Sequence, residues 1–176
     1  MISYKKVHTI VFDFDGVFTN NKVLVSDNGN ETVICDRGDG SGLELLRKFC
    51  NEEKHNINLF ILSREKNNVV SSRAKKLSIE CFQGIDNKLE FLQSELSSEG
   101  LTNDGLVYLG NDLNDLEVMD FAGFSVAPID SHQRILSIAD EVIEKKGGYG
   151  FVREFIERFI DIESMSDKKI INLLRK

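Results

Sequence analysis

The sequence predicts an α/β fold in which a mostly parallel sheet is sandwiched between helices. Short apolar runs, predicted as strands, are found at 7–12, 59–62, 106–109 and 124–127. Between them, at 42–50, 67–77, 88–96 and 115–122, apolar residues recur every three or four positions and predict helices. Strands and helices in this alternation are typical of βαβ units, whose strands run parallel beneath helices on both faces.

Length and composition fit one globular domain. The chain has 176 residues, of which 41% are hydrophobic and 29% charged, as is common in globular domains. We expect a single domain at 1–163 and a helical tail at 164–176. Leu173 and Leu174 belong to a helical apolar pattern in this tail and predict docking on the domain or on a partner.

The net charge and the absence of targeting signals limit the classes of partner that we expect. The net charge of −7 argues against nucleic acid, because that affinity rests on basic surface. No apolar run approaches the roughly 20 residues that cross a bilayer, so we expect no membrane partner. The first residues lead directly into a strand and leave no room for a signal peptide. Cys35, Cys50 and Cys81 are unclustered, which favours reduced thiols and a cytoplasmic protein.

A β-hairpin interrupts the alternation at about 20–36. Two runs rich in β-branched residues, 22–26 and 31–35, flank a turn that contains Asn28 and Gly29, and Asn-Gly is a strong hairpin signal. We expect the hairpin to project beside the carboxyl ends of the parallel strands. There it either covers a site or pairs with a neighbouring subunit, because two strands alone are marginally stable.

Two carboxylates stand one residue apart directly after the first predicted strand. Asp13 and Asp15 converge on one point, since neighbours i and i+2 of a strand face the same side, and Gly16 then breaks the strand. Such charges must be hydrated, paired or bound to a cation. Ser63 and the segment 110–112 stand at the ends of two further strands. The sequence therefore predicts a divalent-metal and phosphate site at this edge of the sheet.

The acidic pair suits phosphoryl transfer, which needs an in-line nucleophile, a cation and positive donors. Asp13 is the candidate nucleophile and forms an aspartyl-phosphate. Asp15 is the candidate acid that protonates the leaving alcohol and then activates water, a role that needs a raised pKa. Mg²⁺ is the expected cofactor, because it takes oxygen ligands and shares carboxylates with substrate phosphate.

Four motifs resemble, in order, those of the haloacid dehalogenase superfamily of phosphohydrolases. They are Asp-x-Asp-Gly-Val-x-Thr at 13–19, Ser63, Lys88, and Gly-Asn-Asp-Leu-Asn-Asp at 110–115. The resemblance implies a Rossmann-like core in which Ser63 and Lys88 bind the phosphate. Asp115 is expected to orient Lys88 or a ligand.

The metal set implied by the resemblance is Asp13, the main-chain carbonyl of Asp15, and the corner formed by Asn111 and Asp112. Which of the last two residues is the ligand stays open, because both also suit the cap of a following helix. Relatives usually carry Asp at the position of Asn111. An amide oxygen ligates Mg²⁺ without adding charge, so we expect weaker metal binding unless Asp112 compensates.

Within the superfamily, the chain resembles the branch of 3-deoxy-D-manno-octulosonate 8-phosphate phosphatases, which have no cap domain. Their relatives include nonulosonate (sialic-acid-type) 9-phosphate phosphatases and the C-terminal modules of some CMP-sialate synthetases. The hairpin and the segments 37–43 and 146–154 carry this resemblance. It implies a homotetramer built by the hairpins, in which neighbouring subunits help to close each site.

The residues after Ser63 bear on the sugar. Arg64 and Glu65 stand where octulosonate phosphatases typically have Gly-Arg, and sialate-type relatives place Glu at the second position. Glu65 therefore favours a nine-carbon substrate, and Lys66 and Arg73 match sugar-contacting positions of that sub-branch. Glu65 and Arg73 are nearly as compatible with ordinary charges on a helix face.

Two hypotheses follow. The first is a Mg²⁺-dependent phosphomonoesterase that acts on an acidic keto-sugar phosphate, either a nonulosonate 9-phosphate or octulosonate 8-phosphate. The second is a non-catalytic oligomerisation or regulatory module associated with a CMP-sialate (acylneuraminate) cytidylyltransferase. Retention of Asp13 and Asp15 favours the enzyme hypothesis, whereas Asn111, in place of the usual Asp, leaves the hypothesis of a non-catalytic module open.

Overall fold

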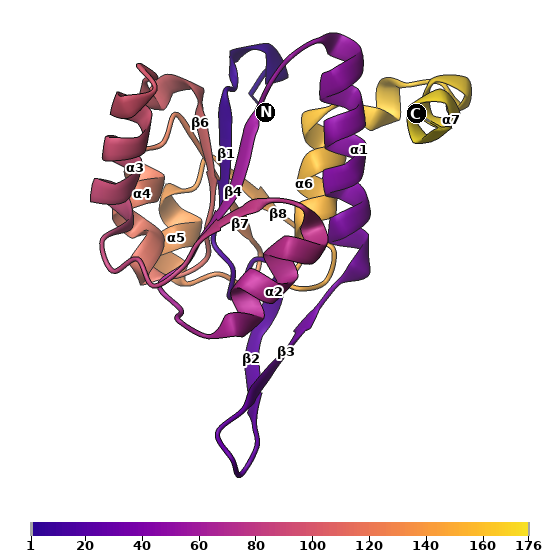
Figure 1. Cartoon of the computed structure of the whole chain (residues 1–176). Coiled ribbons are helices and arrows are strands. Elements are labelled where there is room, and N and C mark those ends of the chain that lie inside the picture. The colour runs from indigo at the N-terminus through magenta and orange to yellow at the C-terminus, as the bar shows by residue number, and fades with distance from the viewer. Residues whose placement is uncertain (1, 176) are drawn as a thin grey trace.

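The computed structural model describes residues 2–175, and in this part of the chain six strands form one sheet (Figure 1). They are β1 (Thr9–Phe12), β4 (Asn58–Leu62), β5 (Glu80–Phe82), β6 (Leu106–Leu109), β7 (Phe124–Pro128) and β8 (Glu141–Ile143). Their order across the sheet is β5-β4-β1-β6-β7-β8, and all neighbours pair in parallel. The predicted α/β class is confirmed.

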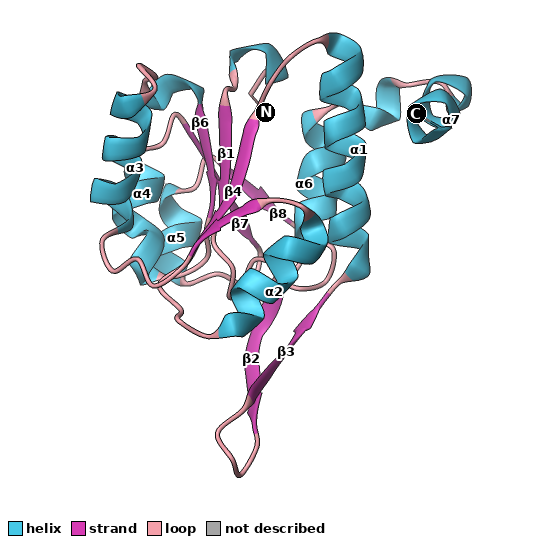
Figure 2. Ribbon diagram, viewed as in Figure 1, coloured by secondary structure: helices cyan, strands magenta, loops and turns pink. Residues whose placement is uncertain are grey.

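Helices cover both faces of this sheet (Figure 2). On one side lie α1 (Arg37–Glu53), α2 (Asn68–Leu77) and α6 (Phe151–Phe159), and on the other α3 (Lys88–Ser98), α4 (Leu116–Phe121) and α5 (Gln133–Ile138). Each layer buries its own hydrophobic cluster. In β1, Phe12 belongs to the cluster under α1 and α6, whereas Val11 belongs to the cluster under α3. This alternation explains why the strands read as unbroken apolar runs.

The four inner strands match the predicted runs, but both edge strands were missed. Each edge strand, β5 and β8, has three residues, which is too short for a periodic signal. Helix α1 begins at Arg37, five residues before its predicted start, because Asp36 caps it by accepting a hydrogen bond from Gly38 N. Gly38 and Gly40 hid this turn from the pattern, because neither carries an apolar side chain. Gly42, where the predicted helix begins, has a packing role. A Cβ there would lie 3.0 Å from Arg153 Cα, so glycine permits the close contact between α1 and α6.

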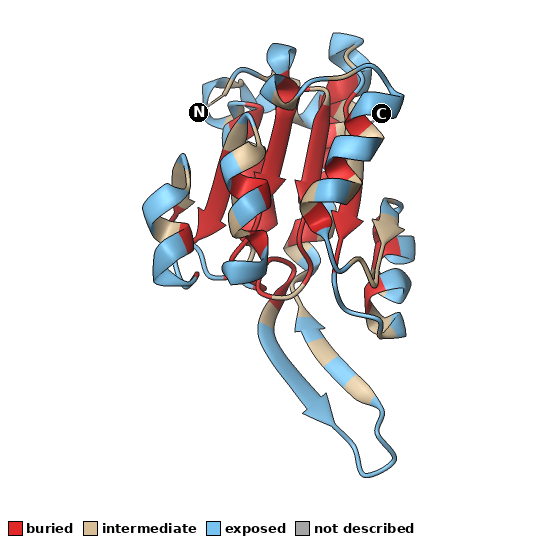
Figure 3. Ribbon diagram, turned by 90° about the vertical axis from the view of Figure 1, so that its left-hand side faces the viewer, coloured by how far each residue is buried: buried red, intermediate tan, exposed pale blue. Residues whose placement is uncertain are grey.

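The predicted hairpin is present as β2 (Thr19–Val25) and β3 (Glu31–Cys35). The two strands are antiparallel, with Val23 opposite Val33, and they form a separate sheet. The turn is closed by a hydrogen bond from Ser26 N to Asn30 O. Figure 3 shows the hairpin projecting from the body, and most of β2 is exposed.

The tail forms α7 (Asp167–Arg175), which packs against α1. Leu173 is buried in the cluster under α1, and Lys48 Nζ donates to Leu174 O at 2.9 Å. The sequence predicted that the tail docks either on the domain or on a partner, and in the structure it docks on the domain. The boundary at residue 163 stays an expectation, and Met1 and Lys176 lie outside the described residues. Within 2–175, no helix combines the length and apolarity that a membrane crossing requires.

Candidate active site

The carboxyl ends of β1, β4 and β6 meet at one edge of the sheet and bring the predicted residues together. Asp13 follows β1, Ser63 follows β4, and Asn111 lies just beyond β6. Backbone hydrogen bonds continue the sheet to this point, because Asp13 N donates to Leu109 O at 2.9 Å. The cavity at this edge has a volume of about 190 Å³. It is lined by Asp13, Asp15, Asn21, Ser63, Arg64, Glu65, Asn111, Asp112 and Asn114.

Asp13 and Lys88 form a buried ion pair at the base of this cavity. Lys88 Nζ lies 2.8 Å from Asp13 Oδ1, and the two residues are 2% and 5% exposed. Burial and then the charge of Asp115 raise the pKa of Asp13, whereas the ammonium of Lys88 opposes that rise. Burial alone would lower the pKa of Lys88, but the two carboxylates raise it above its ordinary value. Lys88 therefore stays positive beside the candidate nucleophile.

Asp15 lines the same cavity and is held by Thr19 at the base of the hairpin. Thr19 Oγ1 donates to Asp15 Oδ1 at 3.0 Å and accepts from Gly16 N at 3.2 Å. Partial burial raises the pKa of Asp15, the hydrogen bond from Thr19 opposes this, and the charges of Glu65 and Glu31 add to the rise. The pKa of Asp15 is thus raised, which is the direction that a proton donor requires.

Asp115 connects Lys88 to the loop that carries Asn111 and Asp112. Its Oδ1 accepts from Lys88 Nζ at 2.7 Å and from the Tyr108 hydroxyl at 2.8 Å. Its Oδ2 accepts from Asn111 N at 3.0 Å and from Asp112 N at 3.3 Å. Asp115 is fully buried, so these donors offset the cost of burying its charge. It orients Lys88, as expected from the sequence.

The loop after β6 distinguishes Asn111 from Asp112. Asn111 is buried, and its Oδ1 has no hydrogen-bond partner among the described residues. Asp112 is exposed and caps the short helix η3 (Leu113–Asp115) through Leu113 N at 2.7 Å. Gly16 has φ +85°, and a Cβ at this position would clash with the Asn111 side chain. Glycine therefore allows the two loops to meet beside Asp13.

This donor set fits Mg²⁺. In residues 2–175, no cluster of three or more His, Cys, Asp and Glu side chains is gathered for a metal ion. A carboxylate of Asp13, the carbonyl of Asp15 and the unpartnered amide oxygen of Asn111 would supply oxygen ligands instead. Mg²⁺ keeps several waters and needs few protein ligands, so a set of this kind suffices.

The four candidate sugar contacts separate into two pairs. Arg64 and Glu65 are exposed and line both the inner cavity and an outer one of about 580 Å³. Lys66 is also exposed but lines neither of these cavities. Arg73 lies on α2, where its Nη2 donates to Asp36 O at 2.8 Å. Sugar contacts by Lys66 and Arg73 stay predictions that the single chain does not support.

Ser63 lines the inner cavity. It is 2% exposed, and its Oγ accepts a hydrogen bond from Glu65 N at 3.1 Å. Because Oγ is already an acceptor, its own O–H is left for an acceptor in the cavity.

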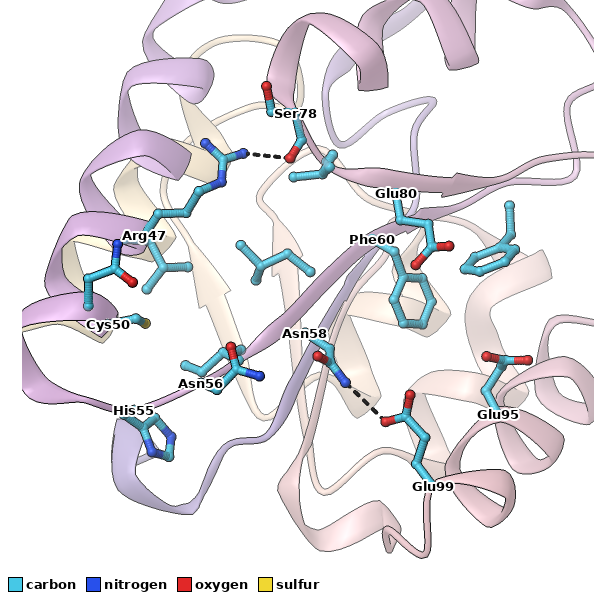
Figure 4. Close-up of a pocket in the computed structure, with 16 residues that line it drawn as sticks. Arg47, Cys50, His55, Asn56, Asn58, Phe60, Ser78, Glu80, Glu95 and Glu99 are labelled. Carbon is cyan, nitrogen blue, oxygen red and sulfur yellow. Dashed lines mark hydrogen bonds between the residues drawn. The ribbon is translucent and has the colours of Figure 1, made fainter.

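Another cavity, of about 460 Å³, lies at the amino end of β4 (Figure 4). Arg47 points toward Ser78 O, and Asn58 Nδ2 donates to Glu99 Oε2 at 3.0 Å. None of the predicted site residues lines this cavity. The chemistry predicted from the sequence therefore belongs to the smaller cavity at the opposite end of the strand.

Sequence reasoning missed two kinds of residue. Asn21 and Asn114 line the inner cavity. Asn114 lies within the motif at 110–115 but was given no role, and nothing in the sequence context of Asn21 singles it out. Tyr108 bonds to Asp115 beneath the cavity. A hydroxyl in the otherwise apolar strand Leu-Val-Tyr-Leu was the signal that would have revealed it.

The fold and site define a protein with a Rossmann-like parallel sheet and a buried aspartate–lysine pair directly after its first strand. A family model described as haloacid dehalogenase-like hydrolase matches residues 3–155. The chain belongs to this family. The predicted class, a phosphatase of the haloacid dehalogenase superfamily, is confirmed.

The relatives agree with this assignment. The chain is 28% identical over 169 residues to the 3-deoxy-D-manno-octulosonate 8-phosphate phosphatase KdsC of Salmonella typhi, covering 96% of this chain and 87% of the relative. It is 30% identical over 149 residues to KdsC of Yersinia pestis, covering 84% and 76%.

A solved structure is also similar to the whole fold. It is the 3-deoxy-D-manno-octulosonate 8-phosphate phosphatase of Moraxella catarrhalis, crystallised with magnesium, phosphate and KDO. The TM-score is 0.82 at 29% identity, covering 90% of this chain and 88% of the other.

Proposed function

We propose that the protein is a Mg²⁺-dependent phosphomonoesterase that hydrolyses an acidic keto-sugar phosphate through an aspartyl-phosphate on Asp13. The observation that carries the proposal is the buried contact of 2.8 Å between Asp13 Oδ1 and Lys88 Nζ, beside the unpartnered amide oxygen of Asn111. A carboxylate nucleophile, a phosphate-binding ammonium and an oxygen ligand for a metal thus meet at one cavity.

The first half-reaction transfers the phosphoryl group to the protein. Asp13 Oδ1 attacks phosphorus, the bond from phosphorus to the sugar oxygen breaks, and Asp15 gives its proton to that oxygen. Lys88 and the hydroxyl of Ser63 donate hydrogen bonds to the phosphoryl oxygens. Bound Mg²⁺ supplies positive charge that offsets the negative charges of the phosphate and the carboxylates.

The second half-reaction restores the enzyme. Asp15, now ionised, takes a proton from a water molecule that attacks phosphorus. The bond to Asp13 breaks, and inorganic phosphate leaves. The hydrogen bond from Thr19 holds Asp15 in place for both steps.

The substrate proposal rests on the relatives and on the cavity lining. Relatives of this chain are named for 3-deoxy-D-manno-octulosonate 8-phosphate, so this is the first substrate to assay. Arg64 offers a cation for a sugar carboxylate at the outer cavity. Glu65 lines the same cavity and favours a nonulosonate 9-phosphate as the second substrate.

We further propose a cytoplasmic homotetramer assembled through the hairpins. Val23, Leu24, Val25 and Ile34 are each between 48% and 65% exposed on the hairpin. Apolar side chains in this number on two projecting strands favour a protein contact. Copies of the same chain are the proposed occupants, because the resemblance to the octulosonate branch implies them.

A sugar-phosphate panel with and without Mg²⁺ tests the function. We expect Mg²⁺-dependent phosphate release from one of the two keto-sugar phosphates, and complete loss of release in Asp13→Asn with an unchanged circular dichroism spectrum. Asp120→Asn, on the exposed side of α4, is the matched control and keeps full activity. Full activity in Asp13→Asn contradicts the mechanism. A flat panel from protein that binds Mg²⁺ favours the non-catalytic module beside a cytidylyltransferase.

A further inference from the structure

Tyr108 carries a hydroxyl at a buried position where an apolar side chain would be sufficient for packing. It lies in β6 between Val107 and Leu109, and all three side chains are fully buried. Phenylalanine would fill almost the same volume. The hydroxyl instead lies 2.8 Å from Asp115 Oδ1 and 3.2 Å from Lys88 Nζ.

The contacts account for every N–H of the Lys88 ammonium. Its three acceptors are Asp115 Oδ1 at 2.7 Å, Asp13 Oδ1 at 2.8 Å and the Tyr108 oxygen at 3.2 Å. An ammonium is tetrahedral and rotates about its last carbon–nitrogen bond unless acceptors hold it. Asp115 and Tyr108 hold two of the three N–H groups, so the third points at the oxygen of Asp13 that attacks phosphorus.

The metal side of the site is held by different atoms. Asp115 Oδ2 binds the backbone of Asn111 and Asp112, whereas Tyr108 contacts Oδ1. Loss of the Tyr108 hydroxyl therefore disturbs the orientation of Lys88 without removing a contact to the loop that carries Asn111.

We propose that Tyr108 is a positioning residue whose hydroxyl holds the Lys88 ammonium with one N–H at Asp13 Oδ1, the atom beside which the phosphoryl group binds. The proposal rests on the phosphatase function proposed above. Without the hydroxyl, one N–H of a buried ammonium loses its acceptor and Asp115 loses a donor. We expect about tenfold weaker binding of inorganic phosphate and unchanged binding of Mg²⁺.

Isothermal titration calorimetry on the intact protein tests this. Mg²⁺ is titrated first, and inorganic phosphate is then titrated at saturating Mg²⁺, for wild type, Tyr108→Phe and Tyr4→Phe. Tyr4 is the matched control, because its hydroxyl also donates to a carboxylate, Glu53 Oε2 at 3.1 Å, but on an exposed surface outside the site. The expected result is a tenfold rise in the phosphate Kd for Tyr108→Phe alone.

The outcomes separate the two proposals. Equal phosphate affinity in Tyr108→Phe and wild type overturns the role of Tyr108, as does equal weakening of phosphate and Mg²⁺, which would indicate a packing role. If wild type binds neither Mg²⁺ nor phosphate, the proposed function itself fails. A thermal melt of each variant checks that all three proteins are folded under the titration conditions.

Discussion

Neutralising Asp39 is expected to make the protein more stable at alkaline pH. Asp39 lies in the first turn of α1 and is fully buried. Its Oδ1 accepts a hydrogen bond from Arg153 N at 3.0 Å, and its Oδ2 has no partner among the described residues. Asp39 thus caps α6, whose own N-cap residue Gly150 provides no side-chain bond. One oxygen is bonded and the other is buried without compensation.

The size of the effect follows from the pKa of Asp39. Burial raises this pKa from the ordinary 3.8 to about 7, against the lowering effect of the bond from Arg153 N. Because the folded pKa is the higher one, the stabilisation is complete below pH 4 and is lost as pH rises toward 7. Each pH unit between these values costs about 1.4 kcal/mol, so the whole interval corresponds to about 4 kcal/mol.

Urea unfolding at constant ionic strength from pH 5.5 to 8.5 measures this loss and avoids the isoelectric point near 5.0. Asp39→Asn keeps an acceptor for Arg153 N but does not titrate. The stability of this variant minus that of wild type is expected to rise by about 2 kcal/mol between pH 5.5 and 7 and then level off. Asp39→Ala also removes the acceptor, so its difference has the same slope but lies about 1–3 kcal/mol lower.

A pH-independent difference for Asp39→Asn would refute the argument, since it would mean that Asp39 is ionised in the folded protein throughout this range. A difference that falls with pH would reverse the sign and indicate that the N-terminus of α6 stabilises the charge more than burial destabilises it.

Three further predictions concern the site and the hairpin. Lys88→Met leaves Asp13 and Asp115 buried without their cation, so urea unfolding is expected to give a free energy of unfolding about 3–5 kcal/mol lower; a variant as stable as wild type contradicts this. Asn111→Asp adds a charged ligand and is expected to bind Mg²⁺ about tenfold tighter by calorimetry, whereas an unchanged Kd contradicts Asn111 as the ligand. Leu24→Glu is expected to lower the oligomer mass in sedimentation velocity; identical masses contradict assembly through the hairpin.

Local patterns were sufficient to predict the inner sheet and half of the site. Strands buried on both faces appear as apolar runs, and the topology then brings the residues after these runs to one edge. Asp13, Ser63 and Asn111 were predictable in this way. The hairpin was predictable because Asn28 and Gly29 determine a local turn.

The remaining features depend on contacts between distant segments. The first turn of α1 lacks an apolar pattern because it contains Gly38 and Gly40, where a Cβ would come close to Arg153 and Leu77, residues far away in the sequence. The contact of Lys88 with Asp13 depends on where α3 begins relative to β1, which no local pattern gives; the family resemblance supplied it. Tyr108 differs, because its partner Asp115 is only seven residues away. The hydroxyl in an apolar strand was a local signal for it, but its contact with Lys88 depends on the placement of α3.

Asn111 affects the balance of charge in the site, because it places a neutral amide where relatives usually carry a carboxylate. Asp13 and Asp115 already share one ammonium in a buried setting, and a third carboxylate at position 111 would stand next to both without a further cation. The amide avoids that repulsion when no metal is bound and still offers an oxygen to Mg²⁺. Weaker metal binding and a more stable metal-free site are therefore two consequences of the same residue. For this reason, Mg²⁺ affinity and metal-free stability should change in opposite directions in Asn111→Asp.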